Sequence, residues 1–315
     1  MIPCYNYGRY LRQCVESVLA QGLDDLRVVI IDNASTDDSV AVARQLASED
    51  SRVELLWHPV NLGPHASFNE GIDLARCDYF MILCADDVLA PGALARGVGI
   101  LEERPDVALM LSADAKPWHG DDLPSIPQPV GWDVIEGRAY IEWCCRAIGQ
   151  GSGAHAMLVR TSAQKQVGHY RAALTHMDDL EMALRLASRG NVVRLHSPLV
   201  FQRMHSANQL SALWEDRLAE LQERAAAFAS FFRNEGASID REHRLEGLTM
   251  RRIGAAAYWS GISHIYRRRR DAGYKLISYC AQLNPMAVVL PPVGHLFRTG
   301  GAVKRMAAVI AGGHR

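Results

Sequence analysis

Apolar and polar positions along the first part of the chain switch between helical and strand-like spacing. Residues 10–21 carry apolar side chains at helical spacing and are followed by Gly22, so this segment is expected to form a helix. Residues 28–31 are apolar at every position, which is typical of a strand buried on both faces of a parallel sheet. Ser35 or Thr36 is then expected to cap a second helix.

The alternation continues further along the chain. Strands are predicted at 53–57, 79–83 and 156–159, with a helix at 64–75, and residues 112–137 are expected to form a loop that either borders a bound substrate or is a peripheral insertion. From Ala212 onward the pattern is helical. The sequence therefore predicts an α/β fold: an open, mostly parallel sheet flanked by helices over residues 1–211, and a helical C-terminal extension over 212–315.

Two pairs of polar residues follow predicted strands directly. Asp32 and Asn33 end one strand, and Asp86 and Asp87 end another. Either pair alone has a local explanation, because Asp and Asn also favour turns and helix caps. In open α/β sheets, however, ligands bind beyond the carboxyl ends of the strands. Together the two pairs indicate a nucleotide and metal site at one sheet edge.

Composition narrows the class of protein. The chain has 315 residues, 49% of them hydrophobic and 22% charged, which is typical of a folded protein with room for one large domain and an appendage. Its seven cysteines have no CxxC spacing, so a zinc site or a disulfide framework is not expected. The sequence has no signal peptide and no run of about 18 apolar residues, so a cytoplasmic protein is expected.

Several familiar motifs are excluded. No Walker A loop, HExxH or GxSxG motif occurs, which argues against P-loop phosphoryl transfer, zinc proteolysis and serine hydrolysis. Residues 149–154 fit a dinucleotide-binding pattern formally, but a helical pattern precedes them and a strand follows, the reverse of what that motif requires. A flexible loop at the acceptor site is the better interpretation.

Five motifs, in order, resemble those of bacterial family 2 glycosyltransferases, which have the GT-A nucleotide-diphospho-sugar transferase fold. The resemblance extends over about residues 1–211. The order of the five motifs along the chain is more specific to the family than any one motif alone. The motifs are Ile2-Pro3-Cys4-Tyr5-Asn6-Tyr7 with Tyr10-Leu11, Ile30 to Asp37, Asn61-Leu62-Gly63 with Asn69-Glu70-Gly71, Leu83 to Asp87, and Asp178-Asp179-Leu180-Glu181 with Leu184-Arg185-Leu186; Arg203-Met204-His205 with Ser211 resembles a motif that closes the catalytic domain.

The resemblance implies an inverting transfer of a sugar from a nucleotide-diphosphate donor, UDP or dTDP, to a hydroxyl of a glycan or lipid-linked acceptor in cell-surface polysaccharide synthesis. Asp87 would be the principal ligand of Mg²⁺ or Mn²⁺, and Asp86 would face the ribose or a metal-bound water. Cys84 stands where the family often has a further acid, which leaves fewer carboxylates for the cation. No nucleic-acid partner is expected.

The other expected site residues either bind the nucleotide-sugar donor or take part in catalysis. By resemblance, Asp32 and Asn33 receive the base opposite a wall of Pro3, Tyr5 and Asn6, although Tyr5 also fits a core position. Arg203 and His205 would face the diphosphate or the metal, whereas a lone histidine is more often structural. Asp179 is the expected general base, preferred over Asp178 by the resemblance; acids in a first helical turn are also favoured by the helix dipole alone.

The two ends of the chain raise separate expectations. Residues 241–315 hold 13 Lys and Arg against 3 Asp and Glu, with a run at Arg267 to Arg270. This basic tail is expected either to hold the enzyme on the anionic inner face of the cell membrane or to pair with the acidic remainder of the chain. At the other end only Met1 and Ile2 precede the first loop, so we expect the natural reading frame to begin upstream.

Two functions of other classes stay open from the sequence. A nucleotidyltransferase of related topology should have a Gly-rich loop after its first strand, which Tyr5-Asn6-Tyr7-Gly8 does not supply. A catalytically inactive binding or assembly protein is suggested only by Cys84. Turnover of a nucleotide-sugar donor would separate these alternatives from a transferase.

Overall fold

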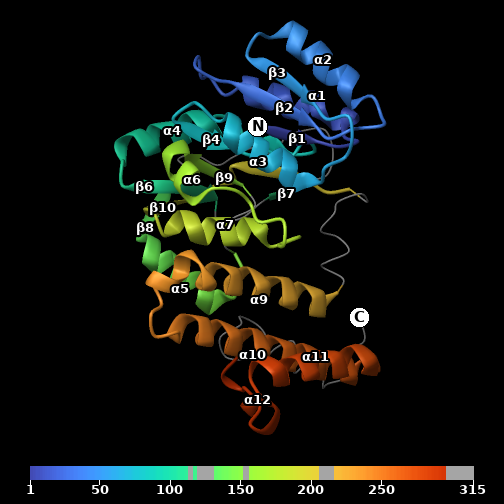
Figure 1. Ribbon diagram of the computed structural model, residues 1–315, viewed down its shortest axis with the longest axis vertical. Coiled ribbons are helices and arrows are strands. Elements are labelled where there is room, and N and C mark those ends of the chain that lie inside the picture. Colours follow the sequence, from blue (N-terminus) through green and yellow to red (C-terminus); the bar gives the residue numbers. More distant parts are fainter. Residues whose placement is uncertain (113–115, 119–130, 152–155, 206–215, 296–315) are drawn as a thin grey trace. The chain divides into compact units, whose positions relative to one another are not determined.

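A computed structural model of the chain describes residues 1–112, 116–118, 131–151, 156–205 and 216–295 (Figure 1). The chain divides into two compact units, one of residues 1–144 and 149–208 and the other of residues 145–148 and 209–315. The boundary predicted between residues 211 and 212 lies outside the described residues.

The first unit alternates strands and helices, as the hydrophobic pattern predicts. Before Asp86 and Asp87 its elements are β1 (Ile2–Cys4), α1 (Gly8–Leu19), β2 (Val28–Asp32), α2 (Ser39–Glu49), β3 (Val53–Trp57), α3 (Pro64–Leu74) and β4 (Tyr79–Met81). They are followed by β5 (Val88–Leu89), α4 (Ala93–Glu103), β6 (Val107–Ser112), β7 (Lys116–Trp118), β8 (Trp132–Ile135), α5 (Gly137–Ala147), β9 (Met157–Arg160), α6 (Thr161–Val167), α7 (Asp178–Ala187), β10 (Asn191–Leu195) and β11 (Val200–Arg203). The α/β fold class is confirmed.

The strands form one parallel and two mixed sheets. Strands β1, β2 and β3 are parallel throughout, and β2 is buried at every position. The second sheet has the order β4-β9-β6-β10-β8, in which only β6 and β10 are parallel, and the third has the order β5-β11-β7. The Met1 amino group donates to the Met81 carbonyl at 2.8 Å, and Leu83 N donates to the Met1 carbonyl at 3.0 Å. These bonds continue the ladder from β1 to β4.

This continuity explains how two distant sequence motifs come to one edge. Asp32 ends β2, and Asp86 and Asp87 follow the segment that pairs with β1 at Leu83. Because the strands here run parallel, their carboxyl ends lie at the same side of the sheet. The edge predicted to hold the ligand is therefore formed by β1, β2 and the turn after β4.

Two local expectations were wrong. Helix α2 begins at Ser39, because Ser35 and Thr36 serve the facing loop instead: Ser35 Oγ accepts from Asn6 N at 2.9 Å and Thr36 N donates to Asn6 Oδ1 at 2.7 Å. The segment expected to be a loop at 112–137 contains strands β7 and β8, which pair with β11 and β10. Both errors arise from tertiary contacts that local sequence does not contain.

The second unit is helical, which confirms the predicted extension. It contains α9 (Arg217–Arg233), a 3₁₀ turn at Glu235–Ser238, α10 (Arg244–Tyr266), α11 (Arg270–Leu283) and α12 (Met286–Val289). Helices α10 and α11 approach closely at Gly261, where an added Cβ would lie 2.9 Å from the Gly273 carbonyl oxygen. None of the helices in the described part of the chain combines the length and apolar character needed to cross a membrane.

Candidate active site

The loops after β1 and β2 are tied to each other at the edge of the parallel sheet. Asn6 has a left-handed backbone (φ 59°) and is held by the bonds to Ser35 and Thr36 described above. Gly8 follows, and its N–H donates to Asp37 Oδ2 at 3.1 Å. A Cβ at Gly8 would lie 2.8 Å from Ser39 N, so only glycine allows α1 to begin this close to α2.

Asp32 lies at the bottom of this edge without exposed surface. Its Oδ1 accepts from Ser35 N at 3.0 Å, whereas Oδ2 has no hydrogen-bond partner among the residues that the structure describes. A buried acceptor without a donor costs about 1–3 kcal/mol. Pro3 and Asn6 are partly buried nearby, and Tyr5 is 42% exposed, so Tyr5 is not a core residue.

Asn33 has a different role from the one expected of it. Its Nδ2 donates to Asn61 Oδ1 and to the Gly63 carbonyl, both at 3.0 Å. Its Oδ1 accepts from Leu62 N at 2.9 Å and lies 3.1 Å from His58 Nδ1. An amide side chain has two donors and two acceptor positions. Asn33 is therefore saturated and orders the loop before α3, with no capacity left to read a base in this conformation.

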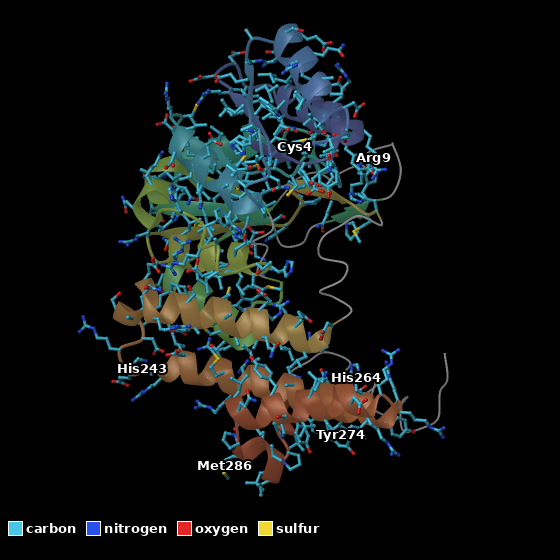
Figure 2. The ribbon with its side chains drawn as sticks, turned by 45° about the vertical axis from the view of Figure 1, so that its right-hand side comes forward. Cys4, Arg9, His243, His264, Tyr274 and Met286 are labelled. Atoms are coloured by element: carbon cyan, nitrogen blue, oxygen red, sulfur yellow. The ribbon has the colours of Figure 1, made fainter. Side chains whose placement is uncertain are left out.

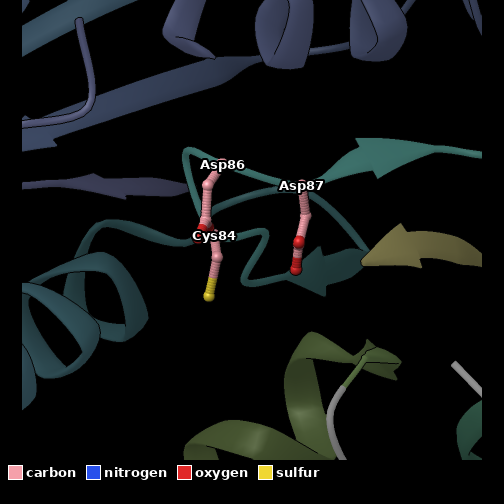
Figure 3. Close-up of side chains that lie close together, drawn as sticks. All are labelled: Cys84, Asp86 and Asp87. Atoms are coloured by element: carbon pink, nitrogen blue, oxygen red, sulfur yellow. The ribbon is translucent and has the colours of Figure 1, made fainter. Parts of the chain in front are cut away.

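Three possible metal ligands converge in the turn after β4. The ligand atoms of Cys84, Asp86 and Asp87 all lie within 4.8 Å of one another. Figure 3 shows that their side chains extend from the turn in the same direction. Two carboxylates suit a hard cation such as Mg²⁺ or Mn²⁺, while a thiol does not. The donor set fits the predicted cation through Asp86 and Asp87.

The electrostatics of this turn favour binding of a cation. Burial, and then the neighbouring Asp86 carboxylate, raise the pKa of Asp87 to about 8, although Asp87 Oδ1 accepts from Arg203 N at 3.1 Å. Cys84 is open to the cavity beside it, yet desolvation and the two carboxylates raise the pKa of its thiol well above the usual range. The thiol therefore stays protonated, and a cation bound here would offset the repulsion between the two carboxylates and favour the ionised form of Asp87.

His205, which the sequence motif predicted to face the diphosphate or the metal, lies beside Asp86. Its Nε2 lies 3.0 Å from Asp86 Oδ2, and both side chains are largely buried. The imidazole stacks on Tyr10 with ring centroids 5.2 Å apart, and Tyr7 approaches its edge at 5.7 Å. Residues from β11, α1 and the first loop therefore fix the orientation of this histidine beside the acidic turn.

Arg203 is buried and bound to protein groups, which differs from the expected phosphate contact. Its guanidinium carbon lies 4.1 Å from the centre of the Trp118 ring and 4.6 Å from that of Tyr10. Nε donates to the Asp86 carbonyl at 3.1 Å, and Nη2 donates to Gln13. Arg203 thus helps to hold the turn that carries Asp86 and Asp87. The sequence motif predicted that Arg203 lies near this turn, but it did not predict these contacts.

Asp179 is in the first turn of α7 and lines a pocket of about 470 Å³ together with Cys84. The other lining residues are mostly apolar: Phe68, Phe80, Ile82, Met157, Val159, Gln164 and Tyr170. Tyr170 lines the pocket beside Asp179, and its hydroxyl favours the ionised form of that carboxyl group, which lowers its pKa. Burial first, and then the charge of Asp178, raise the pKa of Asp179 well above its usual value. A raised pKa makes the ionised carboxylate a stronger proton acceptor, which a general base requires.

A buried ionic network anchors α7, and sequence reasoning missed it. Arg185 Nε donates to Glu181 Oε2 at 2.8 Å, and Arg171 also contacts Glu181. Arg185 further donates to the carbonyls of Val167 at 2.7 Å and His169 at 2.9 Å. The network therefore holds the loop that carries Tyr170. The available signal was the spacing of Glu181 and Arg185 by four residues within an otherwise apolar helix.

The structure thus brings Asp86, Asp87, Arg203 and His205 into contact, and places Asp179 on the same pocket as Cys84. Pro3, Tyr5, Asn6, Asp32 and Asn33 lie on the adjoining strand ends. Ser211 and residues 152–154 of the predicted acceptor loop are outside the described residues.

The family model described as glycosyl transferase family 2 matches residues 1–164, slightly more than half of the chain. The chain belongs to this family. The match contains the strand ends that carry Asp32, Asp86 and Asp87, and it confirms the resemblance found in the sequence motifs. The α7 and β11 residues of this family 2 chain lie beyond the matched region.

Curated relatives share parts of the family 2 chain. An uncharacterised glycosyltransferase of Haemophilus influenzae is 34% identical over 101 residues, which is 32% of this chain and 40% of the relative. The putative glycosyltransferase EpsE of Bacillus subtilis is 28% identical over 194 residues, 59% of this chain and 65% of EpsE. Both relatives are therefore matched over less than two thirds of their own length.

Solved structures of the same fold extend over more of the chain. Residues 1–349 of S. aureus TarS in complex with UDP-GlcNAc superpose with a TM-score of 0.56 at 16% identity, over 89% of this chain and 90% of that 1–349 segment. The mannosyltransferase PcManGT from Pyrobaculum calidifontis, in complex with GDP-Man and Mn²⁺, gives a TM-score of 0.55 at 16% identity, over 98% of this chain and 79% of that one. At this identity the likeness establishes the fold.

Proposed function

We propose that the chain is an inverting glycosyltransferase that moves a sugar from a nucleotide-diphosphate donor to a hydroxyl of a glycan or lipid-linked acceptor in cell-surface polysaccharide synthesis. The observation that carries the proposal is the meeting of two chemical groups at one pocket. A cluster of Cys84, Asp86 and Asp87 lies beside it, and Asp179 lines it with Cys84. Cation binding and proton removal are the two functions that such a transfer requires.

Asp87 and Asp86 would hold Mg²⁺ or Mn²⁺, with His205 oriented by Asp86. The bound cation would offset the charge that develops on the departing diphosphate. Arg203 contributes by fixing the turn, through its bond to the Asp86 carbonyl and the bond from its own N–H to Asp87. Likewise, the protonated thiol of Cys84 leaves the two carboxylates as the ionic ligands.

Asp179 would accept the proton of the acceptor hydroxyl while that oxygen attacks the anomeric carbon from the face opposite the leaving group. Its raised pKa suits this step, because a carboxylate with a raised pKa is a stronger base once it is ionised. Tyr170 orients the carboxyl group, and the apolar walls of Phe68 and Phe80 limit water around it.

The nucleotide would bind at the ends of β1 and β2, against Pro3, Tyr5 and Asn6. The unpartnered Oδ2 of Asp32 supports a pyrimidine donor, UDP or dTDP, because the imide N–H of the base is a suitable partner for a carboxylate. Asp32 has no exposed surface in this structure, so binding there requires the residues that cover it to move. Solved relatives of the fold are complexes with UDP-GlcNAc and with GDP-Man.

Donor hydrolysis tests this function directly. The full chain is incubated with Mn²⁺ or Mg²⁺ and a panel of UDP-, dTDP- and GDP-sugars, and release of the nucleoside diphosphate is measured. We expect metal-dependent release from at least one pyrimidine donor, and loss of release in Asp179→Asn. Nucleotide binding without turnover of any donor would instead indicate a binding or assembly protein.

We also propose that the helical unit attaches the enzyme peripherally to the anionic cytoplasmic face of the membrane. Arg267–Arg270 are exposed at the turn between α10 and α11, and within the described part of this unit no carboxylate forms an ion pair with them. Large apolar side chains are exposed on the same unit, and Tyr274 and Met286 project outward from it (Figure 2). Each basic residue near such a surface contributes about 1 kcal/mol.

Vesicle sedimentation tests the attachment. The full chain should pellet with anionic vesicles at low salt and remain in solution with neutral vesicles, and added salt should release it. Neutralising Arg267–Arg270 to glutamine should abolish pelleting, while neutralising Arg104, an exposed arginine of the first unit, should not. Unchanged pelleting after the fourfold substitution would contradict the proposal.

A further inference from the structure

We propose that His65 is a positioning residue for the proton-accepting carboxylate: by pairing with Asp178 it offsets the negative charge beside Asp179 and holds the first turn of α7 in place. This inference rests on the proposed role of Asp179 as general base. It concerns a residue outside the acidic motif itself, on a different helix.

His65 and Asp178 form a largely buried ion pair between two helices. His65 Nε2 lies 3.0 Å from Asp178 Oδ2, and the side chains are 14% and 11% exposed. The backbone of Leu174 lies near the imidazole and favours its protonated form, and the ring meets that of Phe68 edge to face with centroids 5.9 Å apart. The ring therefore has partners on α3, on α7 and on the loop before α7.

Helix α3 holds the same region at two further points. Asn69 Oδ1 accepts from Tyr170 N at 2.7 Å, and Asn69 Nδ2 donates to the Tyr170 carbonyl at 3.1 Å. The Phe68 and Tyr170 rings meet edge to face at 5.4 Å. Tyr170 and Asp179 line the same pocket. The contacts from α3 therefore position Tyr170 and Asp178, the aromatic and the acidic residue beside the proposed base.

The charges around His65 make its electrostatic role specific. Asp178 faces it from the first turn of α7, while Glu181 on the same helix is already bound by Arg171 and Arg185. The Asp178 carboxylate, 3.0 Å away as an ion-pair partner without hydrogen-bond alignment at Nε2, raises the pKa of His65, and the Asp178 charge in turn raises the pKa of Asp179. His65 is thus the cation that limits how strongly Asp178 opposes ionisation of Asp179.

The test compares pH profiles of kcat/KM in full-length variants. In His65→Gln the midpoint of the acidic limb should move to higher pH by about one unit. This is the lower end of the pKa shift that a neighbouring charge produces in a carboxyl group. In Asp178→Asn it should move downward, and adding His65→Gln to Asp178→Asn should move it little further. His65→Lys should restore the wild-type limb, since it returns a cation. His169→Gln is the matched control, because His169 forms an exposed pair with Asp73 at 2.8 Å.

A purely structural histidine gives a different result. It would lower kcat/KM by the same factor at every pH, and lysine would not rescue it; either outcome overturns the proposal. Titration of the His65 ring by NMR is independent of turnover. The pKa of His65 should fall toward about 6.5 in Asp178→Asn. An unchanged value would refute the pairing, whereas a fall in a chain that turns over no donor would show that the proposed function, and not the pair, is wrong.

Discussion

Replacing Arg185 by methionine should destabilise the first unit strongly. Arg185 is 1% exposed and Glu181 is fully buried, so the substitution leaves a buried carboxylate with Arg171 as its remaining cation. It also removes the donors that serve the carbonyls of Val167 and His169. Breaking a buried pair costs about 3–5 kcal/mol. Because Arg171 remains, we expect a loss near the lower limit, about 3 kcal/mol.

Urea unfolding, followed by tryptophan fluorescence and far-UV circular dichroism, measures this loss as a shift of the midpoint. The matched control is Arg104→Met, since Arg104 pairs with Asp106 at 2.7 Å on the surface and exposed pairs contribute about 0–1 kcal/mol. The double variant Glu181→Met/Arg185→Met should recover much of the stability, because it buries no unpaired charge. If Arg185→Met loses no more than Arg104→Met, the network does not hold α7 and the reasoning is wrong.

Three further predictions concern the site. Asp87→Asn and Asp179→Asn should both abolish transfer, but only Asp87→Asn should weaken calorimetric binding of a nucleoside diphosphate with Mn²⁺; unchanged binding would remove Asp87 from the metal site. Because burial raises the pKa of Asp179, its protonated form stabilises the folded chain, and this stabilisation is lost as pH rises through the folded-state pKa. Asp179→Asn should therefore gain thermal stability over wild type at alkaline pH and show a smaller difference at pH below the ordinary carboxyl pKa. Gly8→Ala should lower stability by about 1–3 kcal/mol through the clash with Ser39 N, and should weaken nucleotide binding; equal stability would show that the loop adjusts.

The sequence predicted those features that depend on periodicity and on strand ends. Residues 28–31 and 53–57 were read as strands because their apolar pattern is local, and β2 and β3 occupy those positions. Asp86 and Asp87 were placed correctly because polar residues after a buried strand must emerge at the sheet edge. His205 was found through a short motif whose spacing is also local.

The remaining features depend on contacts between distant segments. Nothing near Arg203 in the sequence indicates that Trp118 and Tyr10 enclose its guanidinium group, or that Gln13 accepts from it. Asn33 was assigned to the base by resemblance to the family motif, yet the loop at 61–63 and His58 fill its four hydrogen-bonding positions. His65 carried no signal at all, since its partner lies 113 positions further along the chain.

The saturation of Asn33 has a consequence for how this enzyme can diversify. The loop that satisfies Asn33 leads directly into α3, and the first turn of α3 carries His65, which contacts Asp178. A substitution at Asn61 that removes its bond to Asn33 would therefore also displace α3 and with it the contact of His65 with Asp178, beside the proposed general base. Changes in this loop are expected to alter the rate of the proposed reaction among descendants of this sequence.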